Sequence, residues 1–354
     1  MAVLLANALQ ARGAEVSIVA NRPEGPHRAL LSPAVRLYTS PATSALGFVL
    51  YLRRLICDIQ PHVVLAHQTT RNVVSILAHR LSPGLKRRIV VGVEHGEMEF
   101  TLTHRRSLSL RAYFFLARVV YPLADAIVSV SHNVQDSVAR FIAPRRARLT
   151  VMPNPVLAPH VYAQMAEAPQ SPWLRNKAAP VFIGLGRLEA QKDFALLIQA
   201  FAKLRARVEA RLIIFGEGSL RPDLERQVRE LGLERDVALP GFTTNPFAAL
   251  KAADALVLSS IWEGLPTVAI EALACGAQVI STDNSTGIHD ILEQGAAGFI
   301  VPKNDPEALA EAMERALAAP VPDEQLQRAA SHFEASHVAG LYLDLFAALQ
   351  AVRS

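Results

Sequence analysis

Short apolar runs that alternate with helical segments are the feature that most restricts how this chain can fold. The runs at 89–93 and 255–258 are almost entirely hydrophobic, which is typical of strands buried on both faces of a parallel sheet. Segments of helical length, such as 193–207, lie between the runs. Because strand–helix–strand units of this kind build a parallel sheet with helices on both faces, the sequence predicts an α/β fold.

Two such series follow one another, and a chain of 354 residues is long enough for two domains. We predict an N-terminal domain over 1–158, a C-terminal domain over 159–330 and an amphipathic helix within 331–354. The proline-rich segment 155–178 has no strand pattern and is interpreted as the connection between the domains. The first domain begins inside a helix, at 1–13, without the strand that normally opens a doubly wound domain.

The formal net charge of +4 conceals an uneven distribution. Residues 1–158 contain 19 Lys and Arg against 8 Asp and Glu, a net charge of +11, and the remainder of the chain carries −7. A half this basic usually faces an anionic partner, such as nucleic acid, phospholipid or a phosphorylated substrate, although a solvated basic face is the alternative. The sequence contains no recognisable helix-turn-helix or RNA-binding signature, so we expect no nucleic-acid partner.

Neither membrane insertion nor disulfide bonding is expected. No run of 18 or more apolar residues occurs, so the sequence predicts no membrane span. The two cysteines, Cys57 and Cys275, lie far apart in apolar, helix-like contexts. We expect both to be buried free thiols in a reducing cytoplasm.

Two carboxylates in one strand-to-helix connection indicate a site for a polyol next to an anion. Glu263 and Glu271 lie eight positions apart, with Gly264 and Pro266 between them. Pro266 is expected to be the first residue of a helix, which puts Glu263 on the loop and Glu271 about one and a half turns into the helix. The free N–H groups at that helix start suit a phosphate. A nucleotide sugar, with two polyol parts joined by phosphates, matches this layout.

Two cations follow the first strand of the second half. Arg187 and Lys192 flank a turn at the carboxyl end of that strand, where open α/β sheets bind ligands. Together they can neutralise a diphosphate, although an isolated pair at this spacing is more often solvated. Glycine-rich turns at 184–186 and 216–218 would let the backbone approach a ligand closely, with plain tight turns as the alternative.

Taken in chain order, these residues resemble the retaining glycosyltransferases of family 4. The likeness includes the Glu-x7-Glu signature in its EGLP context and, downstream, the segment HDILEQGAAGFIVP over 289–302. It covers nearly the whole chain and is strongest from Pro180 to Pro302. The resemblance implies a GT-B fold, in which two Rossmann-like parallel-sheet domains face each other across a cleft. It also implies that the helix within 331–354 crosses back to the first domain.

The resemblance assigns roles to individual residues. Arg187 and Lys192 would hold the donor diphosphate and stabilise the charge of the leaving group, and Glu271 would bind the ribose. Glu263 would bind hydroxyls of the transferred sugar, and His95, which follows a strand, would lie near that sugar unless it is a structural histidine. Further residues expected around the nucleotide sugar are Gly186, Gly216, Gly218, Gly264, Leu265 and Thr267.

The expected chemistry needs neither a metal nor another cofactor. The sequence has no Asp-x-Asp motif after a strand and no His and acid cluster with metal-ligand spacing. Stabilisation of the leaving diphosphate would then fall to Arg187, Lys192 and the helix start. By family frequency the expected donor is a UDP-sugar, and the expected acceptor is a cell-envelope polysaccharide or a lipid-linked glycan.

The segment 104–122 is the best candidate for contact with an anionic membrane surface. His104, Arg111 and Arg118 are spaced by seven and would share a helix face, and the aromatic run 113–115 suits an interface. The alternative is that the aromatics belong to the core. With the membrane interpretation, the protein would be cytoplasmic and peripheral on the inner face of the cytoplasmic membrane.

The absent opening strand is the main departure from the family. In this fold that strand is central, so its absence predicts unpaired backbone groups and an open core. Two explanations are open: a start assigned too late, or a degenerate protein that needs another strand or partner. Two other functions are also open, namely a sugar-nucleotide epimerase of the same fold and a non-catalytic nucleotide-sugar-binding subunit.

Overall fold

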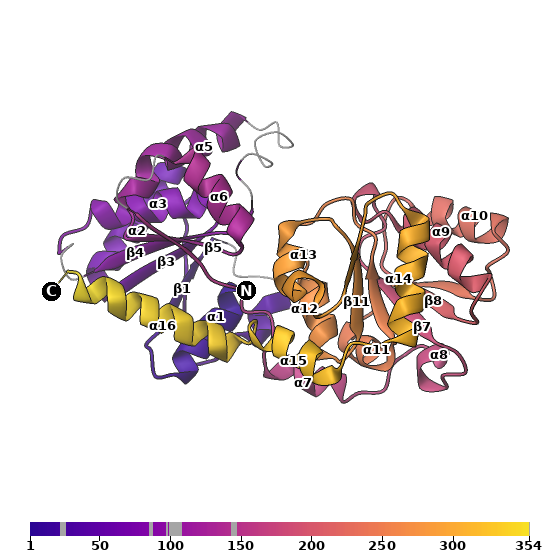
Figure 1. Cartoon of the computed structure of the whole chain (residues 1–354). Helices are drawn as coiled ribbons and strands as arrows, with labels where there is room; N and C mark the ends of the chain where they lie inside the picture. Colours follow the sequence, from indigo (N-terminus) through magenta and orange to yellow (C-terminus); the bar gives the residue numbers. More distant parts are fainter. Residues whose placement is uncertain (22–25, 85–87, 97, 99–107, 143–146, 354) are drawn as a thin grey trace. The chain divides into compact units, whose positions relative to one another are not determined.

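The computed structural model describes residues 1–21, 26–84, 88–96, 98, 108–142 and 147–353. They divide by packing into two compact units. Unit 1 comprises Met1–Pro155 together with Phe333–Ser354, and unit 2 comprises Val156–His332. Each unit is an α/β arrangement of parallel strands and helices, as predicted (Figure 1).

Unit 1 contains two parallel sheets and the helices that flank them. Its strands are β1 (Ser17–Ala20), β2 (Arg36–Thr39), β3 (Val63–His67), β4 (Ile89–Glu94), β5 (Ala126–Ser129) and β6 (Arg148–Val151). Its helical segments are α1 (Ala2–Ala11), η1 (Pro26–Leu30), α2 (Ala45–Ile59), α3 (Thr69–Arg80), α5 (Leu108–Val120), η3 (Tyr121–Leu123), α6 (His132–Phe141) and α16 (Ala335–Ala351).

Unit 2 contains one parallel sheet. Its strands are β7 (Val181–Leu185), β8 (Arg211–Phe215), β9 (Val237–Gly241), β10 (Ala255–Leu258), β11 (Gln278–Thr282) and β12 (Phe299–Val301). Its helical segments are α7 (Pro159–Met165), α8 (Pro172–Arg175), η4 (Ala190–Lys192), α9 (Phe194–Arg205), α10 (Arg221–Glu230), α11 (Pro246–Ala252), α12 (Thr267–Ala274), α13 (Thr286–Ile291), η5 (Glu293–Gly295), α14 (Pro306–Ala318) and α15 (Asp323–Ser331).

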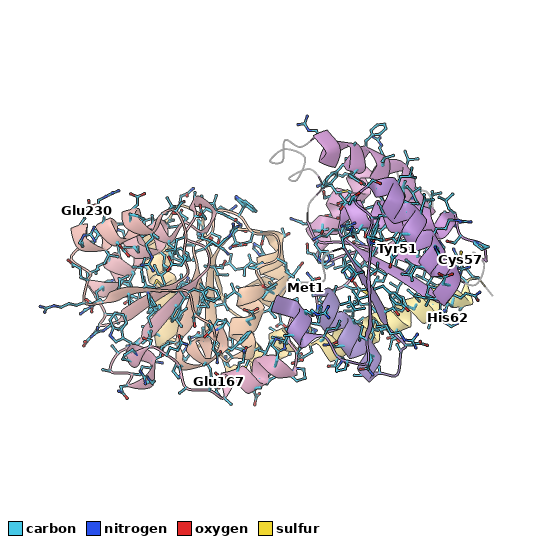
Figure 2. All side chains as sticks on the ribbon, turned by 180° about the vertical axis from the view of Figure 1, so that it is seen from behind. Met1, Tyr51, Cys57, His62, Glu167 and Glu230 are labelled. Carbon is cyan, nitrogen blue, oxygen red and sulfur yellow. The ribbon has the colours of Figure 1, made fainter. Side chains whose placement is uncertain are left out.

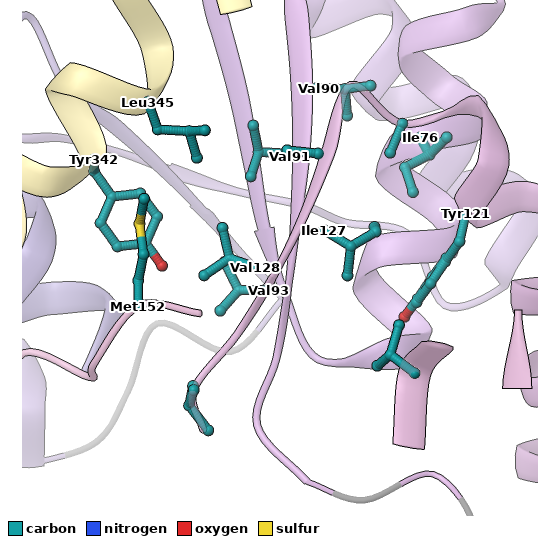
Figure 3. Close-up of a cluster of buried hydrophobic side chains, with 14 of the residues drawn as sticks. Ile76, Val90, Val91, Val93, Tyr121, Ile127, Val128, Met152, Tyr342 and Leu345 are labelled. Carbon is teal, nitrogen blue, oxygen red and sulfur yellow. The ribbon is translucent and has the colours of Figure 1, made fainter. Parts of the chain in front are cut away.

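The core of unit 1 lies on both faces of the β4–β5 region. Alternate residues of a strand point to opposite faces, so Val90 and Val91 of β4 belong to different layers. Figure 3 shows Val90 on the side of Ile76 and Tyr121, while Val91 lies on the side of Tyr342. The layer with Tyr342 is supplied by α16, which packs against α1 (Figure 1). The last helix is thereby part of unit 1.

The parallel strands of unit 1 do not form one continuous sheet. β1 pairs with β2, and β3 is the edge of a separate sheet in the order β3-β4-β5-β6. β4 is buried along its whole length, whereas β3 is mostly half-buried. Among the described residues, no strand joins the two sheets.

Unit 2 has a continuous six-stranded sheet in the order β12-β11-β10-β7-β8-β9. The chain starts at β7, in the middle, and moves to one edge before it returns to β10 on the other side of β7. The carboxyl ends of β7 and β10 therefore flank the point where the strand order reverses, which is the usual ligand position in such sheets. The segment expected to be a plain connection contains α7 and α8, which pack against α11 of this unit.

Within the described ranges, no helix is both long and apolar enough to span a bilayer. Both cysteines are free, with Cys275 buried and Cys57 half-buried on α2 (Figure 2). The prediction of two buried thiols is therefore confirmed for Cys275 and wrong for Cys57, because the latter lies on a helix whose outer face is exposed.

Candidate functional site

A largely buried ion pair lies at the point where the strand order of unit 2 reverses. Lys192 ends η4, just after β7, and Glu263 lies on the loop that joins β10 to α12. The Nζ atom of Lys192 is 2.5 Å from Oε1 of Glu263, and the side chains are 18% and 10% exposed. Sequence analysis placed both residues at this edge but assigned them to different parts of the ligand. The structure joins them to each other.

Short polar residues after β10 hold this pair in place. The Ser260 hydroxyl donates to Oε1 of Glu263 over 2.7 Å, and the Ser259 hydroxyl donates to the carbonyl of Lys192 over 2.8 Å. The N–H of Glu263 donates to the carbonyl of Asn284 over 3.2 Å. Sequence analysis missed Ser259, Ser260 and Asn284. Their signal was a polar residue directly after a buried strand, which in a parallel sheet lies at the ligand edge.

The glycines after β7 and β8 have a packing role. A Cβ atom on Gly216 would lie 1.8 Å from the carbonyl oxygen of Gly186, and one on Gly186 would lie 2.9 Å from Cε of Lys192. A Cβ atom on Gly218 would lie 2.4 Å from the carbonyl oxygen of Leu188. Close approach of backbone to backbone therefore requires Gly216 and Gly218, and Gly186 makes room for the Lys192 side chain. Sequence analysis had expected these glycines to allow close approach to a ligand.

Arg187 lies at the same edge and is exposed. Its guanidinium forms no salt bridge or hydrogen bond with any residue in the described part of the chain. It follows Gly186, whose missing side chain makes room for Lys192. This edge therefore presents one cation that is already paired and one that is available to an anion.

The helix after Glu263 begins one residue later than predicted. Pro266 is the N-cap of α12, because its ψ of 83° is not helical, and Thr267 is the first helical residue. No side chain caps this end, so the first N–H groups of α12, those of Thr267 and Val268, have no acceptor inside the helix. Gly264 and Leu265 pack beside α13, where the absent Cβ of Gly287 leaves room for the Gly264 carbonyl.

Glu271 lies on the second turn of α12 and is partly buried. Desolvation raises the pKa of its carboxyl group to about 7. Among the residues that the structure describes, no hydrogen-bond donor reaches this group. A desolvated carboxyl without a donor is unfavourable in the folded chain alone, so its environment suits a ligand that carries hydroxyl groups.

His95 lies in unit 1, directly after β4, and is paired with a histidine that sequence analysis missed. Nδ1 of His67 lies 3.1 Å from Nε2 of His95, and the rings stack with centroids 5.3 Å apart. Burial lowers the pKa of His67 to about 3 and that of His95 to about 4, so both imidazoles are neutral near pH 7. One ring must therefore donate and the other accept.

A second carboxyl group, Glu94, ends β4 and is fully buried. It accepts hydrogen bonds from the Thr69 hydroxyl at 3.1 Å, from the Asn72 amide at 3.0 Å and from the Tyr121 hydroxyl. Desolvation raises its pKa to about 7 despite these donors. Sequence analysis did not single out Glu94, and its complete set of partners indicates a role in the fold.

The predicted membrane segment is only partly described. Residues 104–107, including His104, lie outside the described residues, and the helix that follows is α5. Phe114 is 3% exposed and packs edge-on against Phe141, so this residue belongs to the core, the alternative that sequence analysis left open. Phe115, by contrast, is 72% exposed.

The carboxyl edge of unit 2 brings together an ion pair, an exposed arginine and an uncapped helix start, which are groups of the kind that bind phosphates. Comparison with known proteins identifies the class. The profile described as Glycosyl transferases group 1 matches residues 167–333, and the profile described as Glycosyltransferase Family 4 matches residues 1–157. The chain belongs to the family-4 glycosyltransferases of the GT-B fold.

Individual relatives agree with this assignment. An uncharacterized glycosyltransferase of Methanocaldococcus jannaschii is 30% identical over 246 residues, which cover 68% of this chain and 60% of that protein. N-acetylgalactosamine-N,N'-diacetylbacillosaminyl-diphospho-undecaprenol 4-alpha-N-acetylgalactosaminyltransferase of Campylobacter jejuni is 30% identical over 217 residues, or 61% of this chain and 56% of that protein. The chain thus spans little more than half the length of these two relatives.

The fold agrees with solved structures. The crystal structure of Anabaena HepE in complex with UDP superposes with a TM-score of 0.78 at 19% identity, covering 98% of this chain and 96% of that one. At this identity the likeness establishes the fold and says nothing further of ligands.

Proposed function

We propose that this protein transfers a sugar, with retention of configuration, from a nucleotide sugar to a glycan or lipid-linked acceptor of the cell envelope. The proposal is carried by one observation. At the carboxyl edge of unit 2, the largely buried Lys192–Glu263 pair lies in the same strand-end region as the exposed Arg187, which forms no salt bridge with another described residue. The name of the Campylobacter relative specifies a diphospho-undecaprenol-linked acceptor, which supports the lipid-linked alternative for this chain.

The diphosphate of the donor would bind between the two cations and the start of α12. Lys192 has three donors and uses one on Glu263, so it can contact a phosphate without breaking the ion pair. Arg187 can bind the diphosphate through its planar fork, and the N–H of Thr267 can donate to an oxygen. These groups would stabilise the negative charge that develops on the leaving diphosphate.

The two acids would orient the sugars. Oε1 of Glu263 already accepts from Lys192 and Ser260, which leaves Oε2 for a hydroxyl of the transferred sugar. Glu271 would accept hydrogen bonds from the ribose hydroxyls and thereby gain the donors that it lacks in the chain alone. His95 would contact the transferred sugar from unit 1 as a neutral imidazole.

In the proposed reaction the acceptor oxygen attacks the anomeric carbon from the face that the diphosphate leaves. The bond from that carbon to the diphosphate oxygen breaks, and the bond to the acceptor oxygen forms. The acceptor proton passes to the departing diphosphate, so protein side chains act by position and charge. We propose that a UDP-sugar serves as donor and that no metal is needed, and turnover in the presence of excess EDTA tests the second point.

A product assay with matched controls tests this function. The purified protein is incubated with UDP-N-acetylhexosamine or UDP-hexose and a farnesyl-diphosphate-linked N-acetylhexosamine, and products are identified by mass spectrometry and by the anomeric proton coupling. Formation of a disaccharide with the donor's configuration is expected. Conversion of the donor without any acceptor would indicate the epimerase instead. Nucleotide binding without turnover for any donor would indicate a non-catalytic subunit.

We further propose that α5 contacts the inner face of the cytoplasmic membrane. Its outer face carries the exposed apolar residues Phe115, Leu116 and Val119, and Arg111 and Arg118 are exposed on the same helix. Such a helix can insert its apolar side chains between lipids while the arginines meet anionic headgroups. Co-sedimentation with phosphatidylglycerol vesicles should be reduced by Phe115→Ser and by high salt. Equal sedimentation in all three cases would contradict the proposal.

A further inference from the structure

Unit 1 has a polar pocket at the carboxyl ends of its first strands. The pocket has a volume of about 260 Å³ and brings together the residue after β1 and the first turns of α2 and α3. It lies apart from the unit 2 site in sequence and composition, and no role has been assigned to it above. Its lining residues are Asn21, Ala42, Thr43, Ser44, Ala45, Phe48, Thr70, Arg71, Val74 and Tyr113.

Arg71 is the cation of this pocket. Its Cζ atom lies 4.7 Å from the centre of the Phe48 ring, so the guanidinium is stacked on an apolar wall. It makes no salt bridge with any described residue, and no Asp or Glu is among the lining residues. Arg71 is exposed, and the N–H edge of its stacked guanidinium is open to an anion.

The start of α2 adds hydrogen-bond donors to the same pocket. The side chain of Ser44 caps α2 by accepting from the N–H of Gly47 over 3.1 Å. The N–H groups of Ala45 and Leu46 are left without an acceptor inside the helix. With 15 residues, α2 has a substantial dipole, which favours negative charge at this end.

The start of α3 also adds hydrogen-bond donors to this pocket. This helix has 12 residues, and its N-cap residue Gln68 provides no side-chain hydrogen bond. The N–H groups of Thr70 and Arg71 therefore have no acceptor within α3, and the Thr70 hydroxyl lies in the pocket wall. The side chains of Asn21 and Tyr113 complete a polar lining, with Asn21 held by a 3.1 Å hydrogen bond to the carbonyl of Ala42.

We propose that this pocket binds a phosphate group of the acceptor, specifically the diphosphate that joins a lipid to the sugar being extended. The inference rests on the proposed function and names the acceptor's chemistry. The pocket combines an arginine that has no carboxylate partner among the described residues, the starts of two helices, and hydroxyl groups. All of these groups can donate hydrogen bonds to the oxygens of a phosphate. The net charge of +11 on residues 1–158 favours the approach of such an acceptor.

Exposed apolar residues at the start of α2 favour a phosphate that belongs to a lipid-linked molecule. Leu46 follows the lining residue Ala45 and is 69% exposed, and Leu50 lies one turn further along α2, also exposed. The exposed side chain of Leu46, at the start of α2 beside the pocket, is thus available to the first part of a lipid chain.

Acceptor kinetics with a matched pair of acceptors test the proposal. One acceptor is N-acetylhexosamine linked to farnesyl diphosphate, and the other carries the same sugar on an alkyl chain without phosphate. Arg71→Gln should raise KM for the diphosphate acceptor by roughly 10- to 100-fold and leave KM for the donor and for the alkyl acceptor unchanged. Arg71→Lys, which keeps the charge but loses the planar fork, should give an intermediate KM.

Arg36→Gln is the charge-matched control. Arg36 lies at the start of β2, away from the carboxyl edge, and pairs with Glu15 at the surface. It should leave all KM values within about twofold, because exposed ion pairs contribute little. Equal effects of Arg71→Gln on both acceptors, or no effect on the diphosphate acceptor, would overturn the phosphate site while leaving the proposed transferase activity intact.

A binding measurement distinguishes a failure of the phosphate pocket from a failure of the proposed transferase function. With UDP saturating the donor site, pyrophosphate should bind wild-type protein in calorimetry at least tenfold more tightly than it binds the Arg71→Gln variant. If this difference appears but no donor is turned over, the pocket stands and the proposed function fails. If Arg71→Gln instead weakens binding to phosphatidylglycerol vesicles and leaves pyrophosphate binding unchanged, the phosphate is that of a membrane headgroup and the acceptor assignment is overturned.

Discussion

Two carboxyl groups, one in each unit, have pKa values raised to about 7 by desolvation, yet their surroundings differ. Glu94 in unit 1 receives hydrogen bonds from Thr69, Asn72 and Tyr121. Glu271 in unit 2 receives none from any residue whose placement is described. The comparison separates a carboxyl group whose hydrogen bonds are supplied by the fold from one whose oxygens are left to water or a ligand. A raised pKa alone would not make this distinction.

The ion pair of the unit 2 site should give the largest effect. Lys192→Ala is expected to lower kcat by 10² or more, because a cation that stabilises the leaving diphosphate is lost from a water-poor position. Saturating donor and acceptor in the product assay give kcat directly, and circular dichroism checks the fold. Turnover within about twofold of wild type would remove Lys192 from the proposed mechanism.

Substitution of Glu94 should act on stability. Glu94→Leu leaves the Thr69, Asn72 and Tyr121 donors without their acceptor in a buried place, and we expect the free energy of unfolding to fall by about 2–3 kcal/mol. Urea denaturation measures the change. The matched variant Glu271→Leu should not lower stability, because no donor depends on that carboxyl group. Equal losses for the two variants would break the comparison.

Substitution of Glu271 should act on nucleotide binding. Glu271→Gln is expected to weaken UDP binding about tenfold, because an acceptor for charged hydrogen bonds with the ribose hydroxyls becomes neutral. Isothermal titration calorimetry measures the affinity, and Glu94→Gln serves as the control that should bind UDP normally. Unchanged affinity of Glu271→Gln would show that the ribose binds elsewhere.

The pH dependence of UDP binding should give the smallest effect. The ligand needs ionised Glu271, whose pKa is about 7, so affinity should be nearly constant above pH 8 and fall as the pH drops through 7. Each pH unit below the pKa costs at most about tenfold, because the proton competes with the ligand. Calorimetry at pH 8, 7 and 6 tests this. Glu271→Gln should remove the dependence, and an equal slope in that variant would assign it to another group.

Much of the unit 2 site was predictable because the carboxyl ends of parallel strands converge. Arg187 and Lys192 follow β7, and Glu263 follows β10 of the same sheet, so their positions along the chain were sufficient to place them at one edge. Their pairing was not predictable, since the 2.5 Å contact between Lys192 and Glu263 depends on loop conformations that hydroxyl groups after β10 stabilise. Gly216 and Gly218 were singled out for close approach to a ligand, and the structure shows that they allow close approach of backbone to backbone.

In unit 1 the fold was more predictable than the polar contacts. The strands at 63–67, 89–94 and 126–129 follow from short apolar runs in the sequence. The Glu94 cluster was hidden, because Glu94 ends an apolar run and its partner Tyr121 lies 27 residues away. Arg71 was equally hidden, because nothing in its local sequence shows that two helix starts and an aromatic ring meet around it.

The break between β2–β1 and β3–β6 has a consequence for how unit 1 opens. No backbone ladder ties the two-stranded sheet to the four-stranded one within the described residues, so only side-chain packing and the covering helices hold it in place. Amide protons of β1 should therefore exchange with solvent through a local detachment that leaves those of β4 and β5 protected. The smaller sheet is the part of this unit that can come loose by itself.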